Sequence, residues 1–479
     1  MSRQPERRGA SSSAQGPFGR GRDNPQANTA SSSSISFRPR SHAVEVSAEA
    51  GNGGGVWPEL FVEAVAREVA LFAANRDGAL AAGPAVVSMF QVCSTWRTVS
   101  NSEILWEALA RRVWNTRQTT RRTQSWREEY IRLHLTASNF RHNRAKHTSI
   151  EYEVSSDSSS NGTGATCRCL ALSPEYLAGG FFDGAVRIFS LTSTECVRVM
   201  NPAHESRLGL SRAIAGIVMF DDKVVFASFD GSVFVGSVLS GHVRCAHVGN
   251  VVNDGTLVDF TGCERFWVGL YAGIPGHACH IWDAVTEQLV FNAGDITDPE
   301  ALRGWRLLTQ QFERIGRVKL NGDGILLTAT RLKVAVFDLE TYGMCFSMEE
   351  STVDGQEFIV ECVETNENRF LTASDNGTAR IRRVTDFEDV CSFSFDEAAD
   401  NNSTSSSGST NNRKAYGSLN TWQAFLCIDG VVHAWDANSG VRLHRLDEQM
   451  GEVFDLVADD EHVACCAVDT GIHLWSFRS

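Results

Sequence analysis

The fold of this chain is indicated by the stretch "FFDGAVRIF", residues 181–189, in which an Asp-Gly pair precedes an apolar strand that ends in an aromatic residue. Asp-Gly and Asn-Gly pairs favour hairpin turns, because the central turn positions need residues that tolerate positive φ. We therefore predict that the second part of the chain consists of short antiparallel strands. Related stretches are "SFDGSVFVG" (228–236), "SDNGTARIR" (374–382), "CIDGVVHAW" (427–435) and "AVDTGIHLW" (467–475).

The position that ends each such strand can be followed through the chain at regular intervals. The steps between successive markers are 47, 46, 55, 45, 53 and 40 residues, and the long steps coincide with insertions at 295–316 and 400–414. A four-stranded unit repeated seven times at about 40–45 residues is typical of a WD40-like β-propeller. The markers are Phe189, Gly236, Trp282, Phe337, Arg382, Trp435 and Trp475.

The last repeat ends at the third strand of a blade, so its outer strand must come from elsewhere. Just before the first repeat, Thr148, Ile150, Tyr152 and Val154 alternate with polar residues, as in a half-buried strand. We predict that residues 148–154 complete the seventh blade. This pairing removes an exposed sheet edge that would favour aggregation.

Composition excludes several other classes of protein. No apolar run reaches the roughly 20 residues that a membrane crossing needs, and the N-terminus has no apolar signal core, so we expect a soluble intracellular protein. Residues 1–55 and 398–414 lack large apolar side chains and are predicted to be disordered, the second as a loop.

The cysteines and the chemistry-bearing residues do not suggest a catalytic or metal site. Thirteen cysteines without a repeated CxxC pair indicate free thiols in a reducing compartment. The run His277, Cys279 and His280 ("HACH") has no second ligand pair at finger spacing, so no metal and no cofactor are expected. No nucleotide-binding or nucleophile motif is present, and the protein is not expected to be an enzyme.

A separate helical segment precedes the repeats. In "WPELFVEAVAREVALF" (57–72), Phe61, Val65, Val69 and Phe72 form one stripe of an amphipathic helix. The stretch "VCSTWRTVSNSEILWEAL" (92–109) is also rich in large apolar side chains. Because the ring closes on itself, these side chains remain for a small core of their own and for a partner protein.

This segment resembles the F-box, a three-helix motif that docks on a Skp1-type adaptor. The resemblance rests on Trp57-Pro58, on Val92-Cys93 followed by Trp96-Arg97, and on Leu105-Trp106. The chain departs from the motif by having Trp in place of the usual Leu and a long Ala/Gly-rich link at 73–84. The adaptor-binding residues that the resemblance implies are Trp57, Pro58, Leu60, Phe61, Val65, Phe90, Val92, Cys93, Trp96, Arg97, Leu105, Trp106 and Leu109.

The expected architecture is a small all-α F-box module (56–110), a basic helical connector (111–147) and an all-β seven-bladed WD40-like propeller (148–479). This combination resembles a substrate-recognition subunit of an SCF (Skp1–cullin–F-box) E3 ubiquitin ligase, which has no catalytic residues of its own. From Trp57 onward the chain resembles plant regulators of floral and organ development. That resemblance implies a nuclear location and a transcriptional repressor as the protein target.

Charge is distributed unevenly along the chain. Residues 111–146 contain ten basic and two acidic residues, whereas residues 147–479 contain 24 basic and 46 acidic residues. A ring this negative repels phosphate backbones, so direct nucleic-acid binding by the ring is not expected. The basic strip is predicted to be a solvated helical face, with a nucleic-acid contact or a nuclear address as the alternatives.

The target is expected on the propeller face formed by the links between blades and the central turns within blades. Two other functions remain open at this point: a nuclear transcriptional regulator outside any ligase, and a propeller scaffold without adaptor binding. The predicted target-binding residues are Arg207, Arg212, Arg303, Trp305, Arg306, Arg382 and Arg383.

Overall fold

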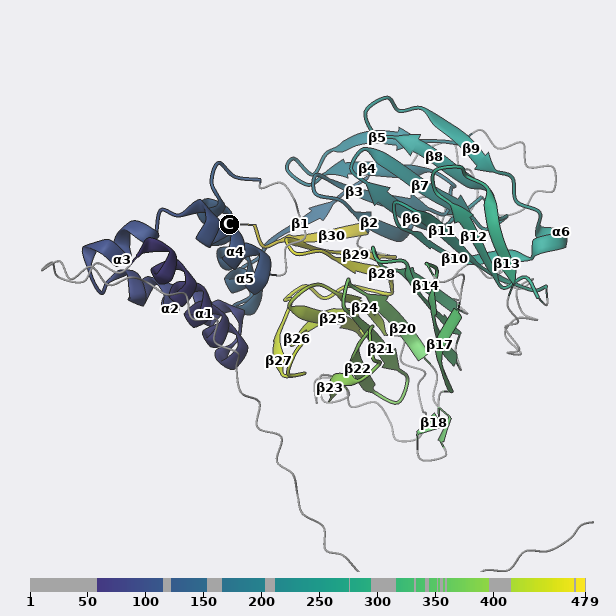
Figure 1. Ribbon diagram of the computed structural model, residues 1–479. Coiled ribbons are helices and arrows are strands. Elements are labelled where there is room, and N and C mark those ends of the chain that lie inside the picture. The colour runs from purple at the N-terminus through teal and green to yellow at the C-terminus, as the bar shows by residue number, and fades with distance from the viewer. Residues whose placement is uncertain are drawn as a thin grey trace, which may run out of the picture. The chain divides into compact units, whose positions relative to one another are not determined.

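Among the described residues, five α-helices precede a ring of strands in the computed structural model (Figure 1). The predicted disordered segments 1–55 and 398–414 lie outside the described residues. The structure describes residues 58–114, 122–152, 166–202, 212–274, 276–293, 316–330, 333–340, 344–350, 352–353, 356–357, 360–395, 415–468 and 471–478.

The helical module comprises α1 to α5 and spans residues 59–141. Ser102 and Ser125 cap α4 and α5, because their side chains accept hydrogen bonds from Leu105 N and Glu128 N at 3.3 and 3.2 Å. The helix α4 crosses the boundary predicted at residue 110. The helices are α1 (Glu59–Asp77), the 3-10 turn η1 (Ala79–Ala81), α2 (Ala82–Phe90), α3 (Ser94–Val99), α4 (Glu103–Val113) and α5 (Trp126–Arg141).

The buried face of α1 differs from the predicted stripe. Val62, Ala66 and Ala70 are fully buried, whereas Phe61 and Phe72 are 46% and 65% exposed. Small side chains let α1 approach the other helices closely, which turns its largest aromatic residues toward solvent. The amphipathic helix is therefore confirmed, but only Val65 and Val69 of the predicted stripe pack against the module core.

The strands form seven four-stranded antiparallel blades, as predicted. The first strands of neighbouring blades contact one another, and β28 contacts β2 to close the ring. Blades 1 to 3 consist of β2 (Cys167–Leu172), β3 (Tyr176–Phe181), β4 (Val186–Ser190) and β5 (Cys196–Met200); β6 (Ile214–Phe220), β7 (Lys223–Ser228), β8 (Val233–Ser237) and β9 (Val243–His247); and β10 (Thr256–Gly262), β11 (Phe266–Ala272), β12 (Cys279–Asp283) and β13 (Leu289–Ala293).

The remaining blades follow in the same order around the ring. A short helix, α6 (Val251–Asp254), links blades 2 and 3, and the pair β18 (Thr352–Val353) and β19 (Gln356–Glu357) links blades 4 and 5. Blades 4 to 7 consist of β14 (Gly316–Leu320), β15 (Ile325–Thr330), β16 (Lys333–Asp338) and β17 (Met344–Glu350); β20 (Val360–Thr365), β21 (Arg369–Ser374), β22 (Thr378–Arg383) and β23 (Asp389–Ser394); β24 (Tyr416–Leu419), β25 (Gln423–Ile428), β26 (Val431–Asp436) and β27 (Arg442–Arg445); and β28 (Val453–Ala458), β29 (His462–Ala467), β30 (Gly471–Ser476) and β1 (Lys146–Ile150).

All seven marker positions occupy the same place in their blades. Each lies in the third strand and pairs with the second residue of the preceding strand, as Phe189 does with Leu177. In blade 2 the marker is Gly236, where a Cβ would lie 2.7 Å from the sulfur of Met200. The repeat is thus confirmed even where its aromatic residue is replaced.

The Asp-Gly turns are of two kinds. Both central residues have positive φ only at Asp429 and Gly430 among the described Asp-Gly pairs. At Asp183 only the following glycine is left-handed, and the Asp183 carboxylate accepts a hydrogen bond from Ala185 N at 2.9 Å. The hairpin prediction is confirmed, but in this blade a side-chain hydrogen bond replaces the second positive φ.

The closing strand is present, with different bounds from those predicted. β1 runs antiparallel to β30, from Lys146 opposite Ser476 to Ile150 opposite Ile472. The pairing ends at Ile150, opposite Ile472, one residue from the start of β30 at Gly471. The strand therefore covers 146–150 and not 148–154, of which 153 and 154 lie outside the described residues.

Ring closure can be tested at Ile150, whose side chain is 2% exposed between blades 7 and 1. We expect Ile150→Ala to lower the free energy of unfolding by about 2–5 kcal/mol, because it removes buried apolar volume. Denaturant unfolding measures this. The control is Ser149→Ala, which changes an exposed side chain of the same strand. Equal loss in both variants would contradict the closing role of β1.

Candidate protein-interaction surfaces

Four residues predicted to contact an adaptor lie in the core of the helical module. Phe90, Leu105, Trp106 and Leu109 are between 0% and 7% exposed. Trp106 donates its indole N–H to Ser100 O at 2.7 Å. These side chains stabilise the module from within its core and do not lie at its surface, contrary to their predicted place on a docking surface.

The other predicted adaptor residues lie at or near the surface. Pro58, Leu60, Val92, Cys93 and Arg97 are exposed, with Leu60 at 77% and Val92 at 65%. Phe61 is also exposed. Val65 and Trp96 are partly buried against the module core, and Trp57 lies outside the described residues. The structure adds residues that sequence reasoning missed. The exposed apolar set of the module is Leu60, Phe61, Phe72, Val87, Val92, Ile104, Ile131 and Leu135.

Aromatic side chains join the helical module to the ring. Phe140 of α5 stacks on Phe477, with ring centroids 3.9 Å apart and an interplanar angle of 16°. Trp422, in the turn between β24 and β25, packs edge-on against Trp114 at 6.0 Å and also against Phe140 at 5.6 Å. The cores of module and ring are therefore continuous through Trp422.

An ion cluster around Glu461 reinforces this junction. Glu461 lies in the turn between β28 and β29 and pairs with Arg122, Arg132 and Arg478. Burial by itself raises the pKa of Glu461, but the three arginines outweigh burial and hold it below the ordinary value. The carboxylate therefore stays charged at neutral pH and ties the basic connector to blade 7.

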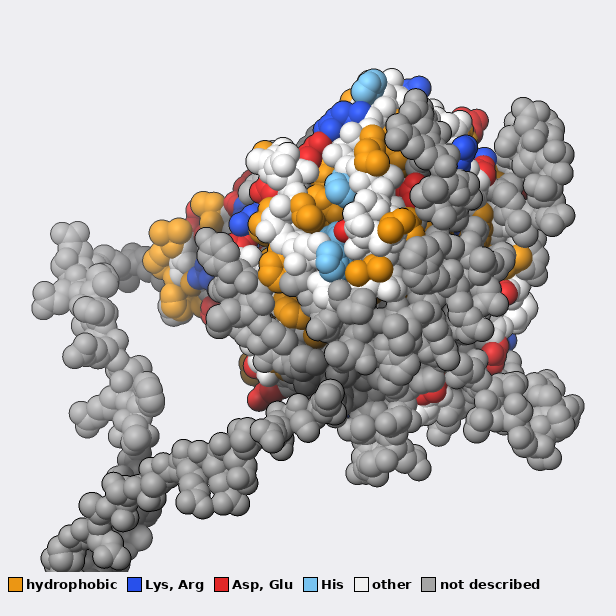
Figure 2. Space-filling model, turned by 90° about the vertical axis from the view of Figure 1, so that its right-hand side faces the viewer, with side chains coloured by type: hydrophobic (Ala, Val, Ile, Leu, Met, Phe, Trp, Pro, Cys, Tyr) orange, Lys and Arg blue, Asp and Glu red, His pale blue; other side chains and the backbone are white. Residues whose placement is uncertain are grey.

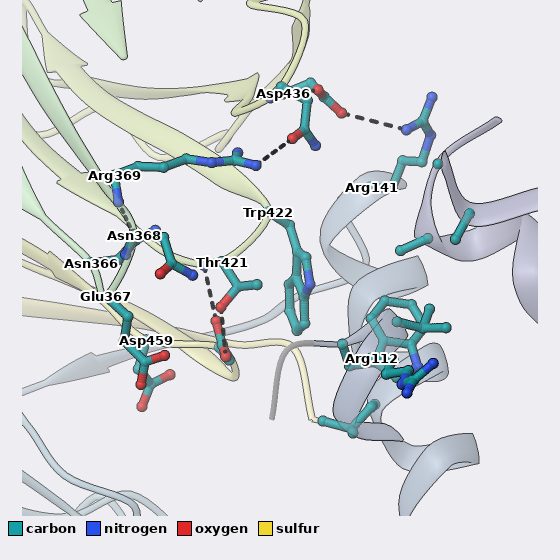
Figure 3. A pocket seen from close by; sticks show the side chains of 18 of the residues that line it. Arg112, Arg141, Asn366, Glu367, Asn368, Arg369, Thr421, Trp422, Asp436 and Asp459 are labelled. Carbon is teal, nitrogen blue, oxygen red and sulfur yellow. Dashed lines mark hydrogen bonds and ion pairs between the residues drawn. The ribbon is translucent and has the colours of Figure 1, made fainter. Parts of the chain in front are cut away.

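A polar cleft of about 1040 Å³ runs beside the aromatic contacts (Figure 3). Both signs of charge line it, and some of these charges are paired between the helical module and the ring. Arg141 reaches Asp436 at 3.7 Å, and Arg369 donates to Asn438 at 2.7 Å. We interpret the cleft as the seam between α5 and the ring, where the basic strip meets acidic turns.

The blade topology separates two faces of the ring. Turns between first and second strands, and between third and fourth strands, lie on one face, which we name the junction face. Links between blades and the central turns lie on the opposite, open face. Trp422, Asp436 and Glu461 all belong to the junction face, so the module contacts described above leave the open face uncovered.

The predicted target residues are distributed over both faces. Arg212 is exposed in the link before β6, and its carbonyl lies 2.9 Å from where a Cβ on Gly184 would be, which places it on the open face. Arg382 is buried and paired with Asp389. Arg383 pairs with Asp386 and Glu388 beside the third turn of its blade.

The prediction that Arg382 and Arg383 lie on the open face is thus wrong. Arg382 is the marker position of its blade, Arg383 follows it, and every marker position lies near the junction-face end of its strand. Arg207, Arg303, Trp305 and Arg306 lie outside the described residues.

Comparison with known proteins assigns the chain to a family. It is 39% identical over 428 residues to the transcriptional regulator STERILE APETALA of Arabidopsis thaliana, which covers 88% of this chain and 92% of that protein. The chain belongs to the STERILE APETALA family. The ring from residue 148 to the C-terminus has 332 residues, so the match with this family extends into the helical segment.

Other comparisons add little to the STERILE APETALA family assignment. No family model matches the chain. The crystal structure of the computationally designed Ika8 protein aligns with a TM-score of 0.44 at 16% identity, over 65% of this chain and 96% of that one. Among the described residues, no helix has the length and hydropathy needed to cross a membrane.

The junction can be tested with Glu461→Gln. We expect the free energy of unfolding to fall by about 2–3 kcal/mol at neutral pH. This is less than for a fully buried ion pair, because the arginines are partly exposed. Hydrogen exchange in α5 should also become faster. Because the pKa of Glu461 is lower in the folded state, its ionised form stabilises the fold at pH values above the unfolded-state pKa. The difference in unfolding free energy between wild type and Glu461→Gln should therefore shrink as the pH falls through the folded-state pKa.

Glu388→Gln is the control for this substitution, because Glu388 makes an ion pair while 71% of its side chain is exposed. The two experiments together separate a junction from a surface ion pair. Unchanged exchange in α5 together with unchanged stability in Glu461→Gln would show that the cluster does not hold the module on the ring.

Proposed function

We propose that this protein is a substrate-recognition subunit of an SCF E3 ubiquitin ligase, with the helical module as the F-box. The observation that carries the proposal is the exposed apolar set on a module whose core is already filled. Leu60, Val92 and Ile104 are 65% to 77% exposed although Leu105, Trp106 and Leu109 pack inside. Large apolar side chains left at the surface of a small module favour a protein partner.

The partner proposed for the exposed apolar set is a Skp1-type adaptor, and through it a cullin. The order of the sequence motifs, from Pro58 through Val92-Cys93 and Trp96-Arg97 to Leu105-Trp106, supports this choice. The buried members of the motif set the helix packing, and the exposed members offer contact area. The protein itself needs no catalytic residue for this role, so we propose a non-catalytic receptor.

The arrangement of module and ring supports a positioning role. The junction holds the helices on one face through Phe140, Trp422 and Glu461, and the target is proposed to bind the open face. A rigid connection keeps adaptor and target at a defined separation, which raises the effective concentration of target lysines near the ubiquitin-charged enzyme. Arg212 remains a proposed target contact on that face.

The target and location are proposed from the family. Arabidopsis STERILE APETALA is named a transcriptional regulator, which supports a nuclear protein that removes a transcriptional repressor during floral and organ development. A regulator that binds DNA directly is the second candidate, favoured by the basic strip. Against it, Arg122, Arg132 and Arg141 of that strip are paired with acidic residues of the ring.

Adaptor binding can be tested with the double variant Leu60→Asp/Ile104→Asp in the full chain. Both side chains are exposed, so the fold should persist while two apolar contacts are replaced by charges. We expect at least a tenfold loss of affinity for a purified Skp1-type adaptor, measured by calorimetry. Val285→Asp is the control, because Val285 is 82% exposed on the ring.

Two results would count against the receptor function. One is adaptor affinity that is equal in the double variant and in wild type, and the other is no adaptor binding by wild type. Affinity purification with and without proteasome inhibition then identifies the target. Tight DNA binding at low salt that falls steeply as salt rises would favour the direct regulator instead.

A further inference from the structure

Three metal-ligating side chains meet at blade 3, away from the helical module. Asp254 ends α6 in the link before β10, His277 lies in the turn between β11 and β12, and His280 lies in β12. The carboxylate oxygen and the two imidazole nitrogens all lie within 4.8 Å of one another. Since a link between blades and a central turn supply them, the cluster belongs to the open face.

His280 is the most telling member of this cluster. Its side chain is buried, with the residue 1% exposed, yet neither ring nitrogen has a hydrogen-bond partner. Leaving a buried polar group without a hydrogen-bond partner destabilises the folded state. The imidazole of His280 stacks on the ring of Tyr271, and their centroids are 4.1 Å apart. An oriented, unpaired imidazole at a cluster of other ligands is what a metal site requires before the ion binds.

Asp254 and His277 can adjust to an ion. His277 Nδ1 lies 3.7 Å from Asp254 Oδ1, longer than a hydrogen bond, and the two side chains are 39% and 22% exposed. Asn292 Nδ2 lies 3.2 Å from the same imidazole nitrogen. Zinc ligands at about 2.0–2.1 Å from the metal need donor atoms closer than 4.8 Å, so metal binding requires the side chains of the exposed ligands to move closer to one another.

We propose that Asp254, His277 and His280 bind a divalent cation of the zinc class, which ties the α6 link to the central turn of blade 3. Two imidazoles and one carboxylate suit zinc, whereas calcium and magnesium prefer oxygen ligands alone. Figure 2, which views the side of the ring carrying α6 and β13, shows histidine side chains among hydrophobic ones.

The sequence expectation of no metal rested on the lack of a second pair at finger spacing. His277 and His280 are three residues apart, but the third ligand comes from a different blade connection, 23 residues before His277. Only the pairing of the strands of blade 3 places Asp254 beside the two histidines. The proposed site is independent of the ligase function and of adaptor binding.

The test is calorimetric titration of the full chain with zinc after removal of metal by a chelator. We expect one zinc ion per chain in wild type, and at least a tenfold weaker affinity in His277→Ala and in Asp254→Asn. These two positions are partly exposed, so the fold should survive both changes. His242→Ala, which removes an exposed histidine outside the cluster, should bind as wild type does. Calcium should not bind at matched concentration.

A cobalt spectrum separates this site from cysteine binding, because twelve described cysteines are free. Cobalt at the proposed site should give ligand-field bands without a thiolate charge-transfer band, and His277→Ala should abolish them. Zinc should also raise the melting temperature of wild type but not of His277→Ala. No zinc binding in wild type, equal affinity in all variants, or a thiolate band that persists in His277→Ala would each overturn the proposal.

Discussion

The pairing of β1 with β30 is the constraint on which the rest of this structure depends. It supplies the outer strand of blade 7, and β1 starts at Lys146, shortly after α5 ends at Arg141. One short strand therefore closes the ring and fixes where the helices stand. Because a closed ring has no free edge there, the helices are not needed to cover it, and their outer surface stays available for other contacts.

Charge acts within the same geometry. The basic connector and the acidic ring, which look like two separate properties along the sequence, meet at Glu461, where three arginines surround one buried carboxylate. Trp422 and Phe140 pack against each other at the same junction. Some arginines of the basic strip are thus paired with acidic residues of the same molecule. This explains how a chain with a net charge of −14 carries such a strip without displaying all of it to nucleic acid.

The two faces of the ring consequently carry different groups of residues. The junction face contacts the helices, and the open face carries Arg212 together with the cluster of Asp254, His277 and His280. Strand antiparallelism dictates this division, since it sorts all turns of a blade into two sets. Sequence reasoning proposed the loops of the open face for a target, and it counted Arg382 and Arg383 among them. Both residues lie at the other end of their strand, where ion pairs occupy them.

The sequence by itself determined the seven blades, the closing strand and the presence of a separate helical segment, because these follow from local turn residues and from a period that survives insertion. Only the tertiary structure decided which apolar residues of that segment are core. Val62, Ala66 and Ala70 are buried while Phe61 and Phe72 are exposed, since close helix packing selects small side chains. The junction at Trp422 and Glu461 and the approach of Asp254 to His280 were equally hidden. Such contacts join residues far apart in the chain, and no local pattern records them.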